Sequence, residues 1–294
     1  MALLTKVKTR MAIHAHRKVR SLLDGEYASV HTGRSMDFND LREYVIGDDV
    51  KDLDWRASAR KGELLIKRYV ADRKHTILLV VSASRSMAGL CDAEHTKSDV
   101  AILASGIMGH LATKHSDYVG LILGNAEQKR SIRPSSSEVA LERMLVEIQN
   151  HTTSDAAGQD LDGLLSHVIR TVRRRTILLV VADDVALGEA EQANLRRLRA
   201  QHEILFLTVG DLDPGDASLA GRTLIDVEQG TGLPDFVAAD AELHAEVQAA
   251  DVERQAERRR TLERLGIASE HITDEADVVP AVFRLLERHR HAKR

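Results

Sequence analysis

The sequence predicts an α/β fold whose core is a doubly wound, mainly parallel sheet with one antiparallel edge strand. The first observation is a set of continuous apolar runs of strand length, which is typical of strands buried on both faces. The second is that helix-periodic stretches alternate with these runs, which favours parallel strands joined by crossover helices. The expected strands are 75–81, 118–124, 175–182 and 202–210, and the expected helices are 99–115, 138–149, 160–174 and 188–201.

The chain begins with a basic segment. Residues 1–35 hold seven Lys or Arg against two acidic residues, a net charge of +5. A loose apolar face before Gly25 predicts one helix here, formed by Val7, Met11, Val19, Leu22 and Leu23. A strand is expected at 63–70. Mixed-charge motifs give way to alternating apolar runs near residue 74, so we separate an N-terminal segment, 1–73, from an α/β domain, 74–294.

Local patterns refine the sheet. After 118–124, a polar turn at Asn125 leads to a short strand at 128–133 that Pro134 is expected to end, and such a hairpin indicates an antiparallel edge. The hexapeptide TILLVV occurs at 76–81 and again at 176–181, so both strands should end at the same edge of the sheet. Towards the C-terminus, the pattern predicts a strand at 223–227, a helix at 240–265, a strand at 269–273 and a helix at 278–291.

Composition argues against several function classes. The 294 residues include 41 basic and 45 acidic side chains, a net charge of −4, which argues against a dedicated nucleic-acid binder. Aromatic residues make up only 3%, too few for stacking platforms. Cys91 is the single cysteine in the sequence, so no internal disulfide is expected. Since no apolar run has bilayer length and the N-terminus has no apolar leader, we expect a soluble, cytoplasmic protein.

The stretch 37–69 holds a long, ordered pattern of charged, aromatic and small residues. It resembles the signature of the DUF58 family, bacterial proteins of undefined biochemistry. The matching residues are Asp37, Phe38, Leu41, Arg42, Glu43, Tyr44, Gly47, Asp48, Asp49, Asp54, Trp55, Ser58, Ala59 and Arg60. The serine-rich turn at 82–87 and the heptapeptide LIDVEQG at 224–230 match as well. The resemblance covers about residues 17–290.

The resemblance implies a fold similar to that of von Willebrand factor A (VWA) domains. It also implies a partner, because such proteins are typically encoded beside MoxR-type AAA+ ATPases and are thought to act with them as chaperone-like adaptors for a client protein. We therefore expect a non-enzymatic interaction module with its partner face at the carboxyl ends of the strands, where doubly wound sheets bind ligands. The expected residues of that face are Ser82, Ser84, Ser86, Gln159, Asp160, Asp183 and Asp184.

VWA domains commonly hold a divalent cation at a metal-ion-dependent adhesion site. Against that pattern, this chain has Ser82 in place of an Asp and Gln159 in place of a Thr, whereas Ser84, Ser86 and Asp183 match. We expect no cofactor, because the remaining residues offer little negative charge to a hydrated Mg²⁺. A weak Mg²⁺ site on the three matching residues, helped by Asp160 or Asp184, is the alternative. The serines are expected instead to cap the following turn.

Acidic and basic residues alternate within 42–61. Ion pairs that dock this segment onto the sheet are a better interpretation than a cation or catalytic cluster, because each acid has basic neighbours. The residues concerned are Asp48, Asp49, Asp52 and Asp54 with Arg42, Lys51, Arg56, Arg60 and Lys61. Trp55, the single tryptophan of the sequence, is expected to be a packing anchor.

Two other functions remain open. A metal-dependent hydrolase that uses Asp183, Asp184 and a serine would need a base beside its nucleophile, and the sequence shows no convincing base. A binder of nucleic acid or of an anionic membrane surface would use residues 6–34, and its affinity would depend steeply on salt. Low aromatic content and the acidic remainder of the chain favour a protein partner instead, so nucleic acid is not the expected ligand.

Overall fold

The computed structural model describes residues 2–14, 38–45, 48, 50, 53–69, 74–216, 219, 221–232 and 241–292. The chain forms two compact units. One comprises Met1–Val30 with His75–Arg294, and the other comprises His31–Lys74. The division therefore differs from the expected one at residue 73, because the N-terminal helix belongs with the α/β unit.

The α/β unit is built on a six-stranded sheet within the described residues. Its strand order is β5-β4-β3-β6-β7-β8, which is the doubly wound order 3-2-1-4-5-6 when these strands are numbered along the chain. Only β5, at the edge, runs antiparallel to its neighbour in this sheet, so the predicted fold class is confirmed. The strands are β3 (Thr76–Ser82), β4 (Tyr118–Gly124), β5 (Lys129–Ser135), β6 (Ile177–Asp183), β7 (Glu203–Val209) and β8 (Ala268–Ile272).

The repeated hexapeptide lies at the centre of this sheet. The two copies pair with each other in parallel and in register, Ile77 opposite Ile177 through to Val81 opposite Val181. The expectation that both strands end at the same edge is therefore confirmed. Since the side chains of a strand alternate between the two faces of the sheet, each copy supplies apolar residues to both cores.

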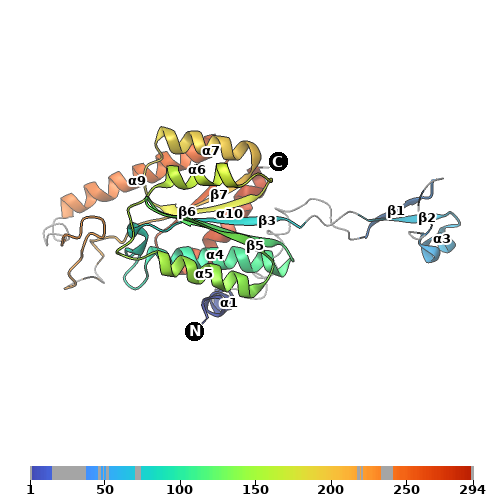
Figure 1. Ribbon diagram of the computed structural model, residues 1–294, viewed down its shortest axis with the longest axis horizontal. Helices are drawn as coiled ribbons and strands as arrows, with labels where there is room; N and C mark the ends of the chain where they lie inside the picture. The colour runs from blue at the N-terminus through green and yellow to red at the C-terminus, as the bar shows by residue number, and fades with distance from the viewer. Residues whose placement is uncertain are drawn as a thin grey trace. The chain divides into compact units, whose positions relative to one another are not determined.

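Helices cover both faces of the sheet (Figure 1). One core lies under α1 (Leu3–His14), α4 (Lys97–Lys114), α5 (Glu138–His151) and α10 (Val278–Ala292). The other lies under α6 (Leu161–Thr171), α7 (Glu189–Gln201) and the C-terminal part of α9 (Ala241–Arg264). Both cores are mainly aliphatic, as the low aromatic content predicts. In the described residues, no helix combines the length and apolar character needed to cross a bilayer.

Helix α1 packs closely on α4. Its buried side chains Leu4, Val7 and Met11 join the α4–α5 core, and a Cβ built on Gly106 would come within 2.5 Å of a Val7 methyl group. Glycine at 106 therefore permits this close approach. The described helix ends at His14, so Val19, Leu22 and Leu23 of the predicted helix lie outside the described residues.

The smaller unit carries the family-like signature. Strand β1 (Phe38–Glu43) pairs antiparallel with β2 (Leu65–Tyr69), and the short helix α3 (Trp55–Lys61) lies between them in sequence. Asp54 caps α3 through the backbone N–H groups of residues 56 and 57. Gly62 ends the helix in the left-handed region, at φ 77°, where other residues are strained. The buried Ser58 Oγ accepts a hydrogen bond from the Leu65 N–H at 2.8 Å.

Two expectations about this signature have different outcomes. Arg42 does pair with Asp48, through two hydrogen bonds of 2.6 Å each, while docking of the segment onto the sheet stays a prediction. Trp55 is 64% exposed at the first position of α3, so it is not buried within its own unit, and its role as a packing anchor stays a prediction. Asp37, Gly47, Asp49, Lys51 and Asp52 lie outside the described residues.

Some predicted boundaries also differ. Strand β5 continues through Pro134 to Ser135, because an edge strand tolerates a residue without an N–H. The expected strand at 223–227 is only an isolated bridge between Ile225 and Gly232. There Asp226 accepts backbone hydrogen bonds from Glu228 and Gln229 and turns the chain. Helix α3 was not predicted, since it is too short to show a periodic apolar face.

Candidate binding face at the carboxyl ends of the strands

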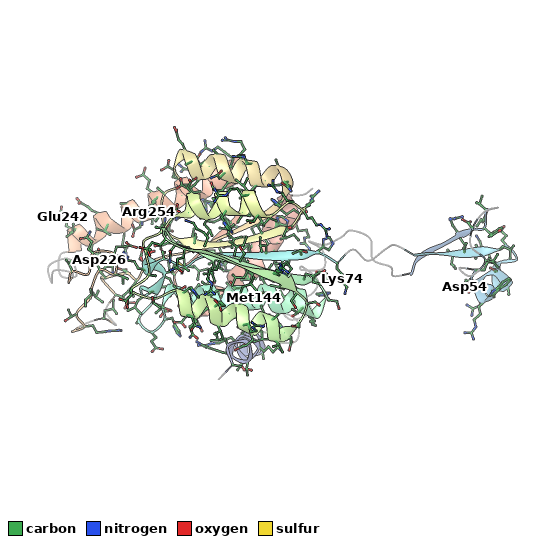
Figure 2. The ribbon with its side chains drawn as sticks, viewed as in Figure 1. Asp54, Lys74, Met144, Asp226, Glu242 and Arg254 are labelled. Atoms are coloured by element: carbon green, nitrogen blue, oxygen red, sulfur yellow. The ribbon has the colours of Figure 1, made fainter. Side chains whose placement is uncertain are left out.

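The predicted functional loops meet at one edge of the sheet. Strand β3 ends at Ser82 and the adjacent, parallel β6 ends at Asp183, so the segments that follow them start side by side. The turn after β3 includes a short 3-10 helix, η2 (Arg85–Ala88), which contacts both α4 and β6. Asp226 and Arg254 lie at this end of the sheet in Figure 2.

The three serines form a buried chain of hydroxyl groups. Ser82 Oγ lies 3.2 Å from Ser84 Oγ, which lies 2.9 Å from Ser86 Oγ. The exposed fractions of the three residues are 3%, 0% and 8%. Ser84 occupies the N-cap position of η2 but makes no capping hydrogen bond through its side chain in the described structure. The expectation that the serines cap the turn is thus wrong for Ser84, because the hydroxyls bond one another.

A lysine that no sequence motif marks lies beside Asp183. Lys97 Nζ donates to Asp183 Oδ1 at 2.7 Å and also to Asp211 Oδ1, and only 2% of Lys97 is exposed. Burial alone would lower the pKa of Lys97, but the two carboxylates outweigh it and raise the pKa above its usual value. The ammonium group therefore stays charged at neutral pH.

Local structure fixes the position of this lysine. It is the first residue of α4, within a capping box in which Thr96 and Asp99 exchange side chain to backbone hydrogen bonds. The Lys97 N–H donates to Gly89 O at 2.8 Å. A lysine at a helix start normally indicates a solvent-exposed side chain, so no sequence signal marked Lys97. Its second partner, Asp211, lies just after the predicted strand 202–210, at the edge of the sheet where ligands were expected.

The second acid of the β6 end is paired with helix α9. Asp184 forms an ion pair with Arg258, and both side chains are 3% exposed. Arg258 Nη1 also donates to Val185 O at 3.0 Å. Burial lowers the pKa of Arg258 to about 10, which still leaves the guanidinium charged at neutral pH. Arg254 lies 3.9 Å from Asp184 and adds positive charge to the same group.

A neutral imidazole completes this cluster. His271 Nε2 lies 3.9 Å from Asp184 Oδ2, and its Nδ1 lies 3.1 Å from Thr208 Oγ1. Burial, together with the charges of Arg258 and Arg254, lowers the pKa of His271 to about 4. At neutral pH the ring is therefore uncharged.

The remaining predicted residues start helix α6. Asp160 is its N-cap and accepts hydrogen bonds from the Gly163 N–H at 2.8 Å and from Lys129 Nζ at 2.6 Å. Burial favours the neutral acid, but these two donors hold the pKa of Asp160 below its usual value. The buried Gln159 Oε1 has no hydrogen-bond partner among the described residues. Asp160 is thus occupied as a helix cap.

The segment after β7 covers the serine turn. Leu212 N–H donates to Leu90 O at 3.0 Å, and Arg222 Nη1 donates to Ala93 O at 2.7 Å. A Cβ on Gly89 would lie 3.5 Å from Val227, so the LIDVEQG heptapeptide lies against the turn that follows β3. The serines and Asp183 are therefore covered, and the exposed charged groups here include Arg85 (38%), Asp211 (65%) and Glu228 (48%).

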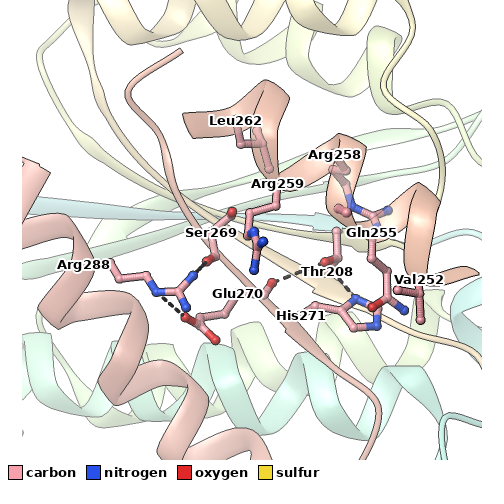
Figure 3. A pocket seen from close by; sticks show the side chains of 11 residues that line it. Thr208, Val252, Gln255, Arg258, Arg259, Leu262, Ser269, Glu270, His271 and Arg288 are labelled. Atoms are coloured by element: carbon pink, nitrogen blue, oxygen red, sulfur yellow. Dashed lines mark hydrogen bonds and ion pairs between the residues drawn. The ribbon is translucent and has the colours of Figure 1, made fainter. Parts of the chain in front are cut away.

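A pocket of about 380 Å³ lies between α9, β7 and β8 (Figure 3). Arg258, Arg259 and Arg288 give its lining a basic character. Arg288 pairs with Glu270 at 3.0 Å and donates to Ser269 O at 3.1 Å, so one of the three charges is already matched within the wall. Arg258 and His271 line this pocket and also belong to the Asp184 cluster.

The residues at the expected cation position do not fit a divalent metal ion. Ser82 supplies a neutral hydroxyl where the pattern needs a carboxylate, and Asp183 Oδ1 already accepts from Lys97 and from the Asp184 N–H. An ammonium 2.7 Å from that carboxylate repels a second cation strongly. Within the described part of the chain, no group of three or more His, Cys, Asp or Glu side chains is arranged to hold a metal.

Comparisons with solved structures give fold-level likenesses. An aerotolerance-related membrane protein of Bacteroides fragilis is 11% identical with a TM-score of 0.44, over 72% of this chain and 98% of that one. BatB of Bacteroides thetaiotaomicron gives the same identity and score, over 73% and 98%. A von Willebrand factor type A protein of Catenulispora acidiphila is 8% identical with a TM-score of 0.41, over 75% and 44%.

Comparisons with sequences identify the family. Uncharacterized proteins of Mycobacterium bovis and Mycobacterium tuberculosis are 26% identical over 208 residues, 69% of this chain. The match spans 63% of the length of these relatives. A family model described as a protein of unknown function, DUF58, matches residues 40–257, which include most of the signature segment and the whole strand-end face. The chain therefore belongs to the DUF58 family.

Proposed function

We propose that this chain is a non-enzymatic, VWA-like interaction module that acts as an adaptor or chaperone partner of a MoxR-type AAA+ ATPase in the cytoplasm. The observation that supports the proposal is that the charged and hydroxyl groups at the strand ends are already paired within the protein. Asp183 is paired with Lys97, Asp184 with Arg258, and Asp160 with Lys129. The serine hydroxyls bond one another. The face is built for a fixed shape and charge pattern, not for proton transfer.

A hydrolase on the same residues receives less support. Nucleophilic catalysis needs a serine within hydrogen-bond reach of a base whose pKa lies near the working pH. The two β6 carboxylates are held by cations, and the pKa of the neighbouring His271, about 4, is far below neutrality. Binding is therefore the function that this geometry supports best.

Contacts of the basic N-terminal helix favour a protein partner over nucleic acid. Lys8 pairs with Glu138 at 2.7 Å and Arg10 pairs with Glu275 at 3.1 Å. Two of the described cations of the segment thus fasten α1 to the α/β unit. A phosphate backbone would have to compete with these carboxylates for them.

The partner surface that we infer consists of the exposed charged groups above the serine turn, Arg85, Asp211 and Glu228. Arg85 and Glu228 are 4.0 Å apart and come from the two segments that meet over the turn. Buried Ser82, Ser84, Ser86, Asp183 and Asp184 act beneath them by holding those segments in place.

The test is capture of a MoxR-type AAA+ ATPase of the same organism by the purified, immobilised full-length chain, with and without ATP. Arg85→Glu should reduce capture at least several-fold, because it reverses a charge at the centre of the face. Arg174→Glu is the matched control, since Arg174 is exposed just before β6 begins, at the opposite edge of the sheet, and should leave capture unchanged. No enrichment of the ATPase in either nucleotide state would contradict the proposal.

A further inference from the structure

We propose that the ammonium group of Lys97 takes the place of the divalent cation that the VWA pattern implies, so that the strand-end face is organised without a metal ion. The juxtaposition behind this inference is a buried lysine held between the expected metal-binding acid, Asp183, and a second acid, Asp211. The inference concerns the chemistry of the face and holds whether or not the adaptor role is correct.

The charge distribution supports this substitution. A cation at a metal-ion-dependent adhesion site draws together oxygens from several loops. Here Lys97 joins segments in the same way, because it comes from α4 while Asp183 ends β6 and Asp211 follows β7. Asp184, the other buried acid at this edge, pairs with Arg258 from α9, whose charge also acts on Asp183. Both acids that would attract a metal ion thus have a cationic partner within the protein.

The lysine is fixed in this position by the fold. Its backbone N–H is bonded to Gly89 O in the turn that follows η2, and its side-chain carbon Cε lies 3.7 Å from the place where a Cβ on Gly89 would be. With 2% of Lys97 exposed, displacing the ammonium would leave a charge in a region with little room for water. A magnesium ion, which gives up its own water reluctantly, would have to make that exchange before it could bind.

The two carboxylates that pair with Lys97 differ in their exposure to solvent. Asp183 is buried beneath the lysine, whereas Asp211 is 65% exposed on the side that faces solvent. Asp211 is therefore the solvent-side acceptor of the Lys97 ammonium group, and Asp183 is the buried one. The chain supplies both the cation and its outer acidic ligand.

The first test uses the unaltered protein. Titration of the metal-free chain with MgCl₂ and with MnCl₂, followed by calorimetry and by Mn²⁺ electron paramagnetic resonance, should show no binding at this face. A saturating metal raises Tm by mass action, so Tm in about 10 mM MgCl₂ should match Tm in EDTA. Binding with a Kd below about 1 mM that Ser84→Ala abolishes would overturn the proposal, since that range covers the weaker physiological cation sites.

The second test removes the lysine. Lys97→Met keeps the stem but leaves Asp183 unpaired, and it should lower Tm by roughly 10 °C. Either Mg²⁺ or a second change, Asp183→Asn, should recover part of that loss, because each cancels the unpaired buried charge. Lys8→Met is the matched control: its pair with Glu138 is exposed on both sides, so Tm should change by about 2 °C or less.

Separate outcomes decide this inference and the proposed function. A Lys97→Met protein as stable as the control, or a double variant no more stable than the single one, would contradict the cation role of Lys97. If Lys97→Met does not fold, the folded state of the double variant and the titration of the unaltered protein still decide the matter. Failure to capture the ATPase would contradict the adaptor role only, because the metal titrations involve no partner.

Discussion

The ion pair between Asp184 and Arg258 allows a quantitative prediction about stability. Arg258→Met replaces the guanidinium by an apolar side chain and leaves the carboxylate of Asp184, 3% exposed, without its main partner. Removing one member of a buried ion pair typically costs about 3–5 kcal/mol. The change also deprives Val185 O of a donor at 3.0 Å, while Arg254, 3.9 Å from Asp184, offsets part of the loss. The expected decrease in unfolding free energy is about 3–4 kcal/mol.

Denaturation by urea, followed by far-ultraviolet circular dichroism, measures this loss. The double variant Asp184→Asn with Arg258→Met removes the unpaired charge and should recover at least about half of the loss, since buried ion pairs can often be replaced by neutral groups at small cost. Arg259→Met is the control on the same helix. Its partner Glu263 is 3.8 Å away and both side chains are about 60% exposed, so the expected change is below about 0.5 kcal/mol. A loss below about 1 kcal/mol for Arg258→Met would refute the reasoning.

Three further predictions concern His271, Cys91 and Gly106. Because the unfolded chain protonates His271 near its ordinary pKa of 6.5 and the folded protein only near 4, acidification from pH 7 to 4 should reduce the unfolding free energy by about 3 kcal/mol through this group. Urea midpoints across that range should depend less on pH in His271→Gln. Cys91, 2% exposed and with a pKa raised by burial to about 12, should react with a thiol reagent only as fast as the protein unfolds, and a native-state rate like that of a free thiol would be inconsistent with this. Gly106→Leu should displace α1, because even a Cβ would be 2.5 Å from Val7, and faster proteolysis near residue 14 would report it.

The sheet could be predicted because its information is local. Continuous apolar runs mark β3, β4, β6 and β7, and the helices between them have clear periodic faces, so strand direction follows from the connections alone. The polar turn at Asn125 likewise indicated the antiparallel edge. Pairing at the strand ends is not local. Lys97 is separated by 86 residues from Asp183 and by 114 from Asp211, and nothing near Lys97 in the sequence distinguishes it from a solvent-exposed lysine.

The surroundings of the serine turn and of Trp55 could not be predicted from residue types alone. Residue types predicted that Ser84 would bond to backbone amides, but three hydroxyls spaced two residues apart can satisfy one another, and they do so here. A single large aromatic residue predicted burial of Trp55, but the unit around it is a two-stranded sheet with one short helix. Such a unit has few apolar residues to cover an indole ring.

The paired hexapeptides at the centre of the sheet have a consequence for folding. Each molecule carries two identical apolar segments that are complementary in parallel and in register, and a short β-branched segment of this kind pairs readily with copies from other chains. While the helices are not yet docked, a segment from one molecule can take the place of its twin in another. The two central strands of the folded sheet, β3 and β6, are thus also segments through which the chain can swap domains or aggregate during refolding at high concentration.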